Sequence, residues 1–294
     1  MLLSIITLNY RKPQLTLNCL NSLYEQLPKE FARGEAEVIV VDNASGDNSV
    51  EFLQHEIKAR HYQHVKVIAN SENAGFGKGN NLGATSAKGE YLLFLNNDTL
   101  VKDQGIWEMA NYLKEHQEIA ILGGQLRNND GSLQPSVGKF YTLFNAFLLL
   151  LGMQKFGLLD RSPDRIVEVD WVKGGLLMIR KEVFAKLAGF DEQIFMYTED
   201  MELCFRAHLA SLKVFFYPKV KVFHAEYGSS NRAFAIIHIY KGLLYFYKKH
   251  RSRWEYSLIK TLLLIKAIIA IIIGSVTHNS YLVTTYKKAI EPLI

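Results

Sequence analysis

Leu93-Phe94-Leu95-Asn96-Asn97-Asp98-Thr99 is an apolar run that ends in a polar tip carrying one carboxylate. This pattern is typical of a buried parallel strand that delivers an acid to the crevice at the carboxyl edge of a sheet, where open α/β folds bind ligands. A hard divalent cation there would take an oxygen of Asp98 and keep coordination positions open for substrate phosphates. The same residues would also suit a strand followed by an Asx turn, and this stretch alone favours the turn.

The composition is that of an ordinary folded protein with a small positive charge. Of the 294 residues, 49% are hydrophobic and 21% are charged, which excludes broad disorder and allows one large core or two modest ones. The formal net charge of +5 suits anionic small molecules or acidic lipid head groups. The excess is too diffuse for nucleic acid and the sequence contains no nucleic-acid motif, so we expect no nucleic-acid partner.

Cysteine usage and the first residues both indicate a reducing compartment. Cys19 and Cys204 are the only cysteines, and they lie far apart in apolar helical contexts, so we expect two buried thiols. Residues 1–8 are apolar but too few for a signal peptide, and the basic pair Arg11-Lys12 follows them. We therefore expect a first buried strand here and a cytoplasmic protein.

The first half of the chain alternates short apolar runs with helical patterns. This alternation is typical of βαβ units around a mostly parallel central sheet with helices on both faces. The predicted strands are Leu2–Leu8, Val38–Val41, Val65–Ala69, Tyr91–Leu95 and Ile119–Leu122, and the predicted helices are Leu15–Leu27, Asn48–Ala59, Gly79–Ala87 and Ile106–His116.

The alternation breaks after Gln125. Residues 129–132, Asn-Asp-Gly-Ser, are a strong turn signal that would close a hairpin. Phe140–Met153 is too short to span a bilayer but long enough for an amphipathic or buried helix. Beyond it we predict strands at Trp171–Ile179 and Lys213–Tyr217, and a helix from about Glu199 to Leu209.

The end of the chain predicts a helical, membrane-associated extension. Lys248–Trp254 is a basic cluster that ends in an aromatic residue, and the apolar run Leu258–Val276 that follows is interrupted by Lys260 and Lys266. A lysine near the middle of a membrane span costs about 2.5–3.5 kcal/mol. A helix lying in the interface would let both lysines reach water, and the basic cluster would attract anionic lipid. We rank this interfacial helix first, a buried core helix second and a transmembrane span third.

Two further segments place polar residues where predicted strands end. Val38–Val41 leads into Asp42, which can accept hydrogen bonds from a nucleobase or a ribose, although a helix-capping turn is the alternative. Residues 70–81, Asn-Ser-Glu-Asn-Ala-Gly-Phe-Gly-Lys-Gly-Asn-Asn, follow a strand and open a helix. Their glycines would let backbone N–H groups approach a phosphate, and Lys78 would add charge. The segment matches neither the P-loop nor the dinucleotide fingerprint.

Thr198-Glu199-Asp200 has two interpretations. Thr198 suits a helix N-cap, and the two acids complement the helix dipole. Two adjacent acids after an aromatic loop could equally place one carboxylate in a cleft as a general base. Position in the sequence does not decide between these interpretations.

In this order the segments resemble family 2 glycosyltransferases with the GT-A fold, especially the bacterial rhamnosyltransferase-like branch. The matching stretches are Ser4–Tyr10, Val41–Ser45, Asn73–Asn81, Leu95–Asp98 and Tyr197–Asp200, and Gly174-Gly175 and His224 also fit. The resemblance covers roughly Leu2 to Tyr247. It implies a GT-A nucleotide-diphospho-sugar transferase domain, which we place at residues 1–230, followed by the extension at 231–294.

The resemblance also implies a role for each site residue. Asp200 matches the family's general base and Glu199 its neighbour, while Asp98 matches the ligand of a divalent cation, Mg²⁺ or Mn²⁺, that bridges the donor diphosphate. His224 is a further metal or phosphate candidate, with a buried structural histidine as an equal alternative. Asn96 stands where the family has an acid. The implied donor-binding residues are Thr7, Asn9, Asp42, Asn73, Gly75, Gly77, Lys78, Asn81, Asn96, Asn97 and Arg206; for Arg206 a structural ion pair is the alternative.

The implied reaction is inverting transfer of a sugar from a nucleoside-diphosphate donor to an acceptor hydroxyl. Rhamnose from a dTDP donor is the first choice, and the apolar segments favour a lipid-linked glycan acceptor for surface polysaccharide at the cytoplasmic side of the membrane. A nucleotidyltransferase would need glycines that Leu8–Lys12 lacks. A non-catalytic nucleotide-sugar or glycan-binding protein of the same fold stays open, although only Asn96 favours it. A membrane scaffold would leave the acid-tipped and glycine-rich loops unexplained.

Overall fold

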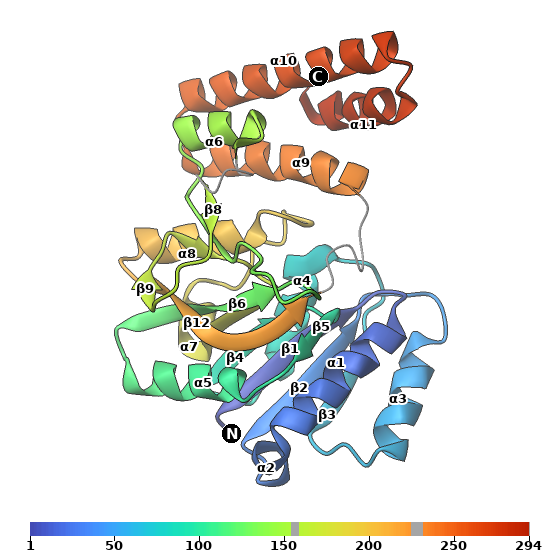
Figure 1. Cartoon of the computed structure of the whole chain (residues 1–294), viewed down its shortest axis with the longest axis vertical. Helices are drawn as coiled ribbons and strands as arrows, with labels where there is room; N and C mark the ends of the chain where they lie inside the picture. Colours follow the sequence, from blue (N-terminus) through green and yellow to red (C-terminus); the bar gives the residue numbers. More distant parts are fainter. Residues whose placement is uncertain (154–158, 225–231, 294) are drawn as a thin grey trace.

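The computed structural model describes residues 1–153, 159–224 and 232–293, as an α/β body with a layer of helices at one end (Figure 1). The elements of the body are β1 (Leu3–Asn9), α1 (Pro13–Gln26), α2 (Pro28–Ala32), β2 (Ala36–Asp42), α3 (Ser49–Ala59), β3 (Val65–Ala69), α4 (Gly75–Ser86), β4 (Tyr91–Leu95), β5 (Thr99–Val101), α5 (Gly105–Glu115), β6 (Ile119–Arg127), β7 (Val137–Gly138), β8 (Asp160–Arg161), β9 (Val167–Glu168), β10 (Trp171–Val172), β11 (Leu176–Arg180), α7 (Lys181–Lys186), α8 (Glu199–Leu209) and β12 (Lys213–His224). The helical layer contains α6 (Leu143–Leu150), α9 (Arg232–His250), α10 (Arg253–Val276) and α11 (Ser280–Ile290), which a single 3-10 turn (Glu291–Leu293) follows.

The central sheet is half parallel and half mixed. Its strand order is β3-β2-β1-β4-β11-β6-β12-β5, with β9 beside β12. The first four strands are parallel to one another, as the βαβ pattern predicts. The expectation of a mostly parallel sheet is wrong beyond β4, because β11 runs antiparallel to both β4 and β6. Between β6 and β11 the described chain forms β7 to β10 and α6 of the helical layer. None of these elements is a helical crossover on the sheet, so β11 returns in the opposite direction.

Several predicted elements have different bounds in the structure; β6 extends to Arg127 and β12 to His224, for example, and two further differences have a clear cause. The helix expected at Gly79–Ala87 already begins at Gly75, because close packing on the sheet outweighs the low helix propensity of glycine. A Cβ on Gly83 would lie 2.5 Å from Cγ2 of Ile6, so only glycine lets α4 approach β1 this closely. The strand expected at Trp171–Ile179 is divided into β10 and β11 by a turn at residues 173–175.

The hydrophobic core lies on both faces of the sheet. Alternate residues of β1 enter different clusters, since Leu3 and Ile5 face one side and Ile6 faces the other. The cluster around Ile6 continues into the helical layer and includes Phe246 of α9 and Leu263 of α10. The C-terminal helices therefore share a core with the body. The domain boundary expected at residues 230 and 231 lies outside the described residues.

Candidate active site

A chain of hydrogen bonds links the carboxyl ends of β1, β2 and β4. Asn9 Nδ2 donates to Oδ1 of Asp42 at 2.7 Å, and Thr16 Oγ1 donates to Oδ1 of Asn9 at 2.8 Å. Asn97 Nδ2 donates to Thr16 Oγ1 at 2.9 Å, while both the backbone N–H and the hydroxyl of Ser45 donate to Asp42. Three residues expected at the donor site, Asn9, Asp42 and Asn97, thus meet at one edge of the sheet. Asp42 is only 4% exposed, and its hydrogen bonds from Ser45 show that the carboxylate also stabilises the local turn.

Asn43 ties this edge to the glycine-rich loop. Its Nδ2 donates to Oδ1 of Asn73 at 3.1 Å and to the carbonyl oxygen of Gly75 at 3.0 Å. Its Oδ1 accepts from the backbone N–H of Ala74. Asn73 Oδ1 in turn accepts from the N–H of Gly75. The loop is therefore held by side-chain amides from the end of β2.

The glycines of this loop also make room for the segment that leads to α8. Gly75 has φ +76°, and a Cβ there would lie 2.2 Å from the carbonyl oxygen of Phe195. The N–H of Phe76 donates to that same oxygen at 2.8 Å. A Cβ on Gly77 would lie 3.0 Å from Cβ of Phe190. Close backbone packing thus accounts for these two glycines in addition to any contact with a phosphate.

Asp98 and His224 meet beyond the tip of β4. Oδ1 of Asp98 lies 3.3 Å from Nε2 of His224, and the Asp98 side chain is 6% exposed. Nδ1 of His224 lies 3.0 Å from Oε1 of Gln134, whose Nε2 donates to the His224 carbonyl oxygen. Because Gln134 Oε1 can only accept, Nδ1 carries a proton. In the neutral ring the lone pair of Nε2 then faces Asn96 Nδ2 and Asp98. A carboxylate oxygen and an imidazole lone pair at this separation form a donor set that suits a divalent cation.

Glu199 and Asp200 begin α8, as the sequence predicts. Asp200 accepts hydrogen bonds of 2.8 Å from the backbone N–H groups of Gly174 and Met201. Burial raises the pKa of Asp200, and those N–H groups oppose the rise. Burial and the charge of Asp200 raise the pKa of Glu199 to about 8. Asp200 therefore keeps two backbone donors that favour its charged form, which makes it the better base candidate of the two.

The base candidate and the metal candidate lie on either side of Gly174-Gly175. A Cβ on Gly174 would lie 3.3 Å from Cβ of Asp200, and a Cβ on Gly175 would lie 3.1 Å from Nδ2 of Asn96. Asn96 in turn contacts His224. The turn between β10 and β11 thus brings the end of β4 and the start of α8 together. Just before α8, Tyr197 has φ +77°, a conformation that is rare for a bulky residue and typical of functional sites.

Three of the expected donor-binding side chains are engaged elsewhere. Lys78 forms an exposed 2.8 Å ion pair with Glu72. Asn81 donates to the carbonyl oxygen of Phe190 and accepts from its N–H. Arg206 pairs with Glu202 and donates to the carbonyl oxygens of Leu187 and Gly189. Its role in the structure is therefore the structural ion pair, the alternative to donor binding that the sequence left open. Thr7 is fully buried, and its hydroxyl has no hydrogen-bond partner among the described residues.

The sequence did not single out Thr16, Asn43 or Gln134. Asn43 directly follows Asp42, so its position after a strand was an available signal. Thr16 lies inside α1 and Gln134 in the loop after β6, and their contacts to Asn97 and His224 join positions 81 and 90 residues apart. Neither residue carries a local pattern that would reveal it.

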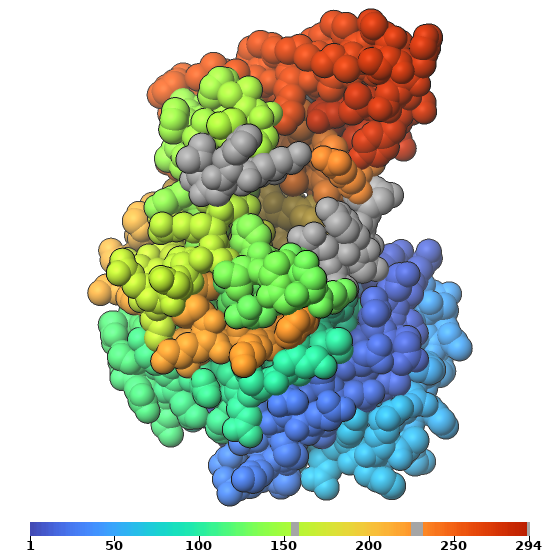
Figure 2. Space-filling view, viewed as in Figure 1, coloured from blue at the N-terminus to red at the C-terminus, as the bar shows by residue number. Residues whose placement is uncertain are grey.

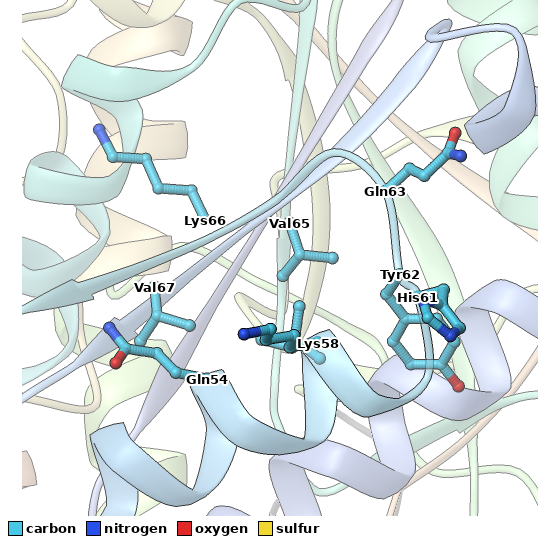
Figure 3. Close-up of a pocket in the computed structure, with 9 residues that line it drawn as sticks. Gln54, Lys58, His61, Tyr62, Gln63, Val65, Lys66 and Val67 are labelled. Atoms are coloured by element: carbon cyan, nitrogen blue, oxygen red, sulfur yellow. The ribbon is translucent and has the colours of Figure 1, made fainter.

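A separate groove lies between α3 and β3, away from these residues (Figure 3). It has a volume of about 580 Å³ and is lined by Gln54, Lys58, His61, Tyr62, Gln63 and Lys66 among others. Its lining includes none of the residues expected at the donor site.

The architecture is that of GT-A glycosyltransferases. The mannosyltransferase PcManGT from Pyrobaculum calidifontis, solved in complex with GDP-Man and Mn²⁺, matches with a TM-score of 0.60 and 16% identity, over 98% of this chain and 84% of that one. The family model for glycosyl transferase family 2 matches residues 4–186. The chain therefore belongs to glycosyl transferase family 2.

Its relatives include rhamnosyltransferases. Rhamnosyltransferase WbbL of Escherichia coli K12 is 29% identical over 197 residues, which are 64% of this chain and 74% of the relative. An N-acetylglucosaminyl-diphospho-decaprenol L-rhamnosyltransferase of Mycobacterium tuberculosis is 24% identical over 218 residues, 66% of this chain and 68% of the relative. These matches confirm the predicted family and its rhamnosyltransferase-like branch.

Proposed function

We propose that this protein is an inverting, metal-dependent hexosyltransferase that uses a nucleoside-diphosphate sugar. The observation that carries the proposal is the placement of the Asp98–His224 pair and of Asp200 on either side of Gly174-Gly175. One side of that turn offers ligands for a cation and the other offers a base. Both are needed to activate a leaving diphosphate and an attacking hydroxyl at the same time.

Asp200 is the proposed general base. The acceptor oxygen forms a bond to the anomeric carbon while its proton passes to Asp200. The bond from that carbon to the donor diphosphate breaks at the opposite face, and the nucleoside diphosphate leaves with the electron pair. A single displacement inverts the anomeric configuration, and no covalent nucleophile is required. Glu199, with its raised pKa, stays protonated and does not compete for the proton.

Asp98 and His224 are the proposed protein ligands of Mg²⁺ or Mn²⁺. No cluster of three or more His, Cys, Asp or Glu side chains occurs in the described part of the chain, so the donor diphosphate would complete the coordination. When bound, the cation stabilises negative charge on the departing diphosphate. Gln134 holds His224 in the tautomer that this role requires. Asn96 occupies the position of the family's usual acid and contacts His224 through its amide.

The linked edge of β1, β2 and β4 is the proposed binding surface for the nucleoside. Asn9, Asp42 and Asn97 supply its polar groups, and Asn73 with the first turn of α4 borders it. Lys78 would have to leave its exposed partner Glu72 to reach a phosphate, which costs little because exposed ion pairs are weak.

We favour rhamnose from a dTDP donor and a lipid-linked glycan acceptor at the cytoplasmic side of the membrane. Support for the sugar comes from the two rhamnosyltransferase relatives, and support for the acceptor from the diphospho-decaprenol named in one of them. The role would then be in synthesis of a cell-surface polysaccharide.

A screen of nucleotide-sugars for thermal stabilisation tests the donor assignment. We expect dTDP-rhamnose to raise the melting temperature more than UDP-GlcNAc or GDP-mannose, and Mg²⁺ or Mn²⁺ to increase the effect. Donor hydrolysis and transfer to a lipid-linked acceptor are then measured with the best ligand. Tight donor binding without hydrolysis or transfer would instead support the non-catalytic binding protein.

A further inference from the structure

We propose that α6 and α10 together form one surface that docks in the plane of an anionic lipid bilayer without crossing it. This inference gives the membrane location proposed above a physical surface, and it does not depend on the transfer chemistry. The sequence already predicts an interfacial helix at Leu258–Val276. The structure adds α6, which is distant from α10 in sequence.

One face of α10 is apolar and exposed. Leu258, Ile265, Ile268, Ile272 and Val276 are separated by three, four or seven residues and are 42–75% exposed, so they share one side of the helix. Trp254, at 64% exposed, extends the same row toward the N-terminus, and tryptophan is enriched at membrane interfaces. The opposite side is buried against the rest of the layer through Ile259, Leu263 and Ala267.

The lysines that argued against a membrane span do not interrupt this face. Lys260 and Lys266 fall outside the exposed row and are half-buried. Neither ammonium group is therefore forced into the lipid when the apolar row enters it.

Helix α6 adds a second row to the same end of the molecule. Phe144 is 69% exposed and Phe147 is 43% exposed, and Leu151 just after the helix is 60% exposed. In the space-filling view α6 lies directly against α10, so the exposed apolar groups of both helices belong to one end (Figure 2). Exposed apolar residues that lie together in this way mark sites of interaction with membranes or proteins.

The charge distribution selects anionic lipid as the occupant. Residues 232–294 carry ten Lys and Arg against two Asp and Glu, whereas residues 1–231 carry 24 against 27. The layer that bears the apolar face is therefore strongly cationic, and the body is slightly anionic. Exposed Lys248, Arg253, Lys287 and Lys288 border the layer and would each gain about 1 kcal/mol beside an anionic membrane surface.

The packing of α11 on α10 favours an in-plane helix. Helix α10 is the one described helix that is long and apolar enough to span a membrane. However, a Cβ on Gly274 would lie 2.9 Å from Leu282 and 3.0 Å from Val283, so α11 folds back closely along α10. A spanning α10 would either lose this packing or draw Lys287 and Lys288 into hydrocarbon. Docking by the outer face keeps both the packing and the hydration of the lysines.

Vesicle flotation of the full chain tests the proposal. We expect binding to phosphatidylcholine vesicles that contain phosphatidylglycerol, with weaker binding to pure phosphatidylcholine and at high salt. The double variants Ile268→Gln/Ile272→Gln and Phe144→Gln/Phe147→Gln, which add no charge, should each weaken binding on the order of tenfold. Because these side chains are exposed, the melting temperature should not fall.

Matched controls separate the face from general effects. Gln54→Ala/Gln63→Ala changes two side chains in the groove of Figure 3 without adding charge and should leave vesicle binding unchanged. A membrane-impermeant maleimide should label the new thiol of Lys288→Cys on vesicle-bound protein. The label is specific because the native thiols of Cys19 and Cys204 are buried. Protection of that thiol would show that α10 crosses the bilayer and would overturn the proposal. Unchanged flotation of both glutamine variants would also overturn it. A third contrary result would be a stable dimer, detected by light scattering, that does not bind vesicles and that the glutamine variants dissociate.

Discussion

The backbone N–H of Gly174 donates a 2.8 Å hydrogen bond to Oδ2 of Asp200, while the carbonyl oxygen of its neighbour Gly175 accepts a 3.2 Å bond from the N–H of Asn96. Two adjacent residues thus hold the first turn of α8 and the tip of β4 together. The arrangement depends on β11, which enters the sheet antiparallel between β4 and β6 and starts right after this turn. The reversal of strand direction is therefore what makes the two halves of the site neighbours.

Asp200→Asn should abolish sugar transfer and leave donor binding intact. Gly174 and Met201 donate to different oxygens of Asp200, so the single amide oxygen can keep only one of these bonds. Because the amide cannot take a proton, we expect a loss of about 10²–10⁴-fold in kcat. Donor binding is measured by thermal stabilisation. Glu199→Gln is the matched control: it copies the protonated form that the raised pKa favours and should retain most of the activity. Near-normal turnover in Asp200→Asn would remove the assignment of the base.

Much of the body could be predicted because its signals are local. Asp42, Asn97 and Asp98 each follow a buried apolar strand, and parallel strands bring such ends to the same edge of a sheet. The start of α8 at Glu199 was predicted correctly, since acids after a threonine suit a helix N-terminus.

The parts of the fold and of the site that could not be predicted depend on contacts between segments that are distant in sequence. Nothing around Gln134 indicates that it holds His224, and nothing around Arg206 shows that it caps the carbonyl groups of Leu187 and Gly189. The early start of α4 at Gly75 is likewise a consequence of packing against Phe195 and the sheet. The antiparallel direction of β11 also follows from the path of the chain and not from its apolar pattern.

Removing the acceptor on Gln134 should weaken metal-dependent donor binding. Gln134→Met keeps the length of the side chain but no longer fixes the proton on Nδ1 of His224, and such a loss typically costs 10–100-fold in metal affinity. The measurement is the Mn²⁺ dependence of donor-induced stabilisation. Asp98→Ala and His224→Ala should weaken donor and metal binding further.

Asn128→Ala is the control for Gln134. It removes a partner of Gln134 Nε2 and leaves the contact to Nδ1 of His224 in place, so the Mn²⁺ dependence should not change. If Gln134→Met has a normal Mn²⁺ dependence as well, Gln134 has no part in positioning the histidine.

Gly242→Ala should disturb the site from the helical layer. A Cβ on Gly242 of α9 would lie 2.0 Å from Oγ1 of Thr198, the residue that precedes Glu199. We expect a loss of about 1–3 kcal/mol in the free energy of unfolding and a reduced kcat, because the start of α8 must move. Thr198→Ala removes the closest atom, so the double variant should recover part of both losses in a double-mutant cycle. Additive losses would mean that α9 does not position α8 through this contact.

Glu202 should control acid stability, because its fully buried carboxylate joins α8 to α9. It accepts from Arg206, from Lys249 at 2.8 Å and from His250 at 2.9 Å. Burial alone would raise the pKa of Glu202, but the hydrogen bonds from His250 and Lys249 and the charge of Arg206 hold it below the usual 4.5. A carboxyl group with a depressed pKa in the folded state contributes stability above its unfolded pKa and loses that contribution as the pH falls through the folded pKa.

Glu202→Gln should therefore destabilise the protein by about 3–5 kcal/mol at neutral pH, since it leaves the largely buried Arg206 without its carboxylate partner, whereas Lys249 keeps Asp191. Below pH 4.5 the difference from the unmodified protein should shrink, because the carboxylate is then protonated in the unfolded chain and increasingly in the folded one. Denaturant unfolding across this pH range measures both effects. Glu56→Gln, which breaks a surface pair with Arg60, should cost less than about 1 kcal/mol at any pH. An equal cost for the two variants at neutral pH would show that the Glu202 cluster does not hold α8 against α9.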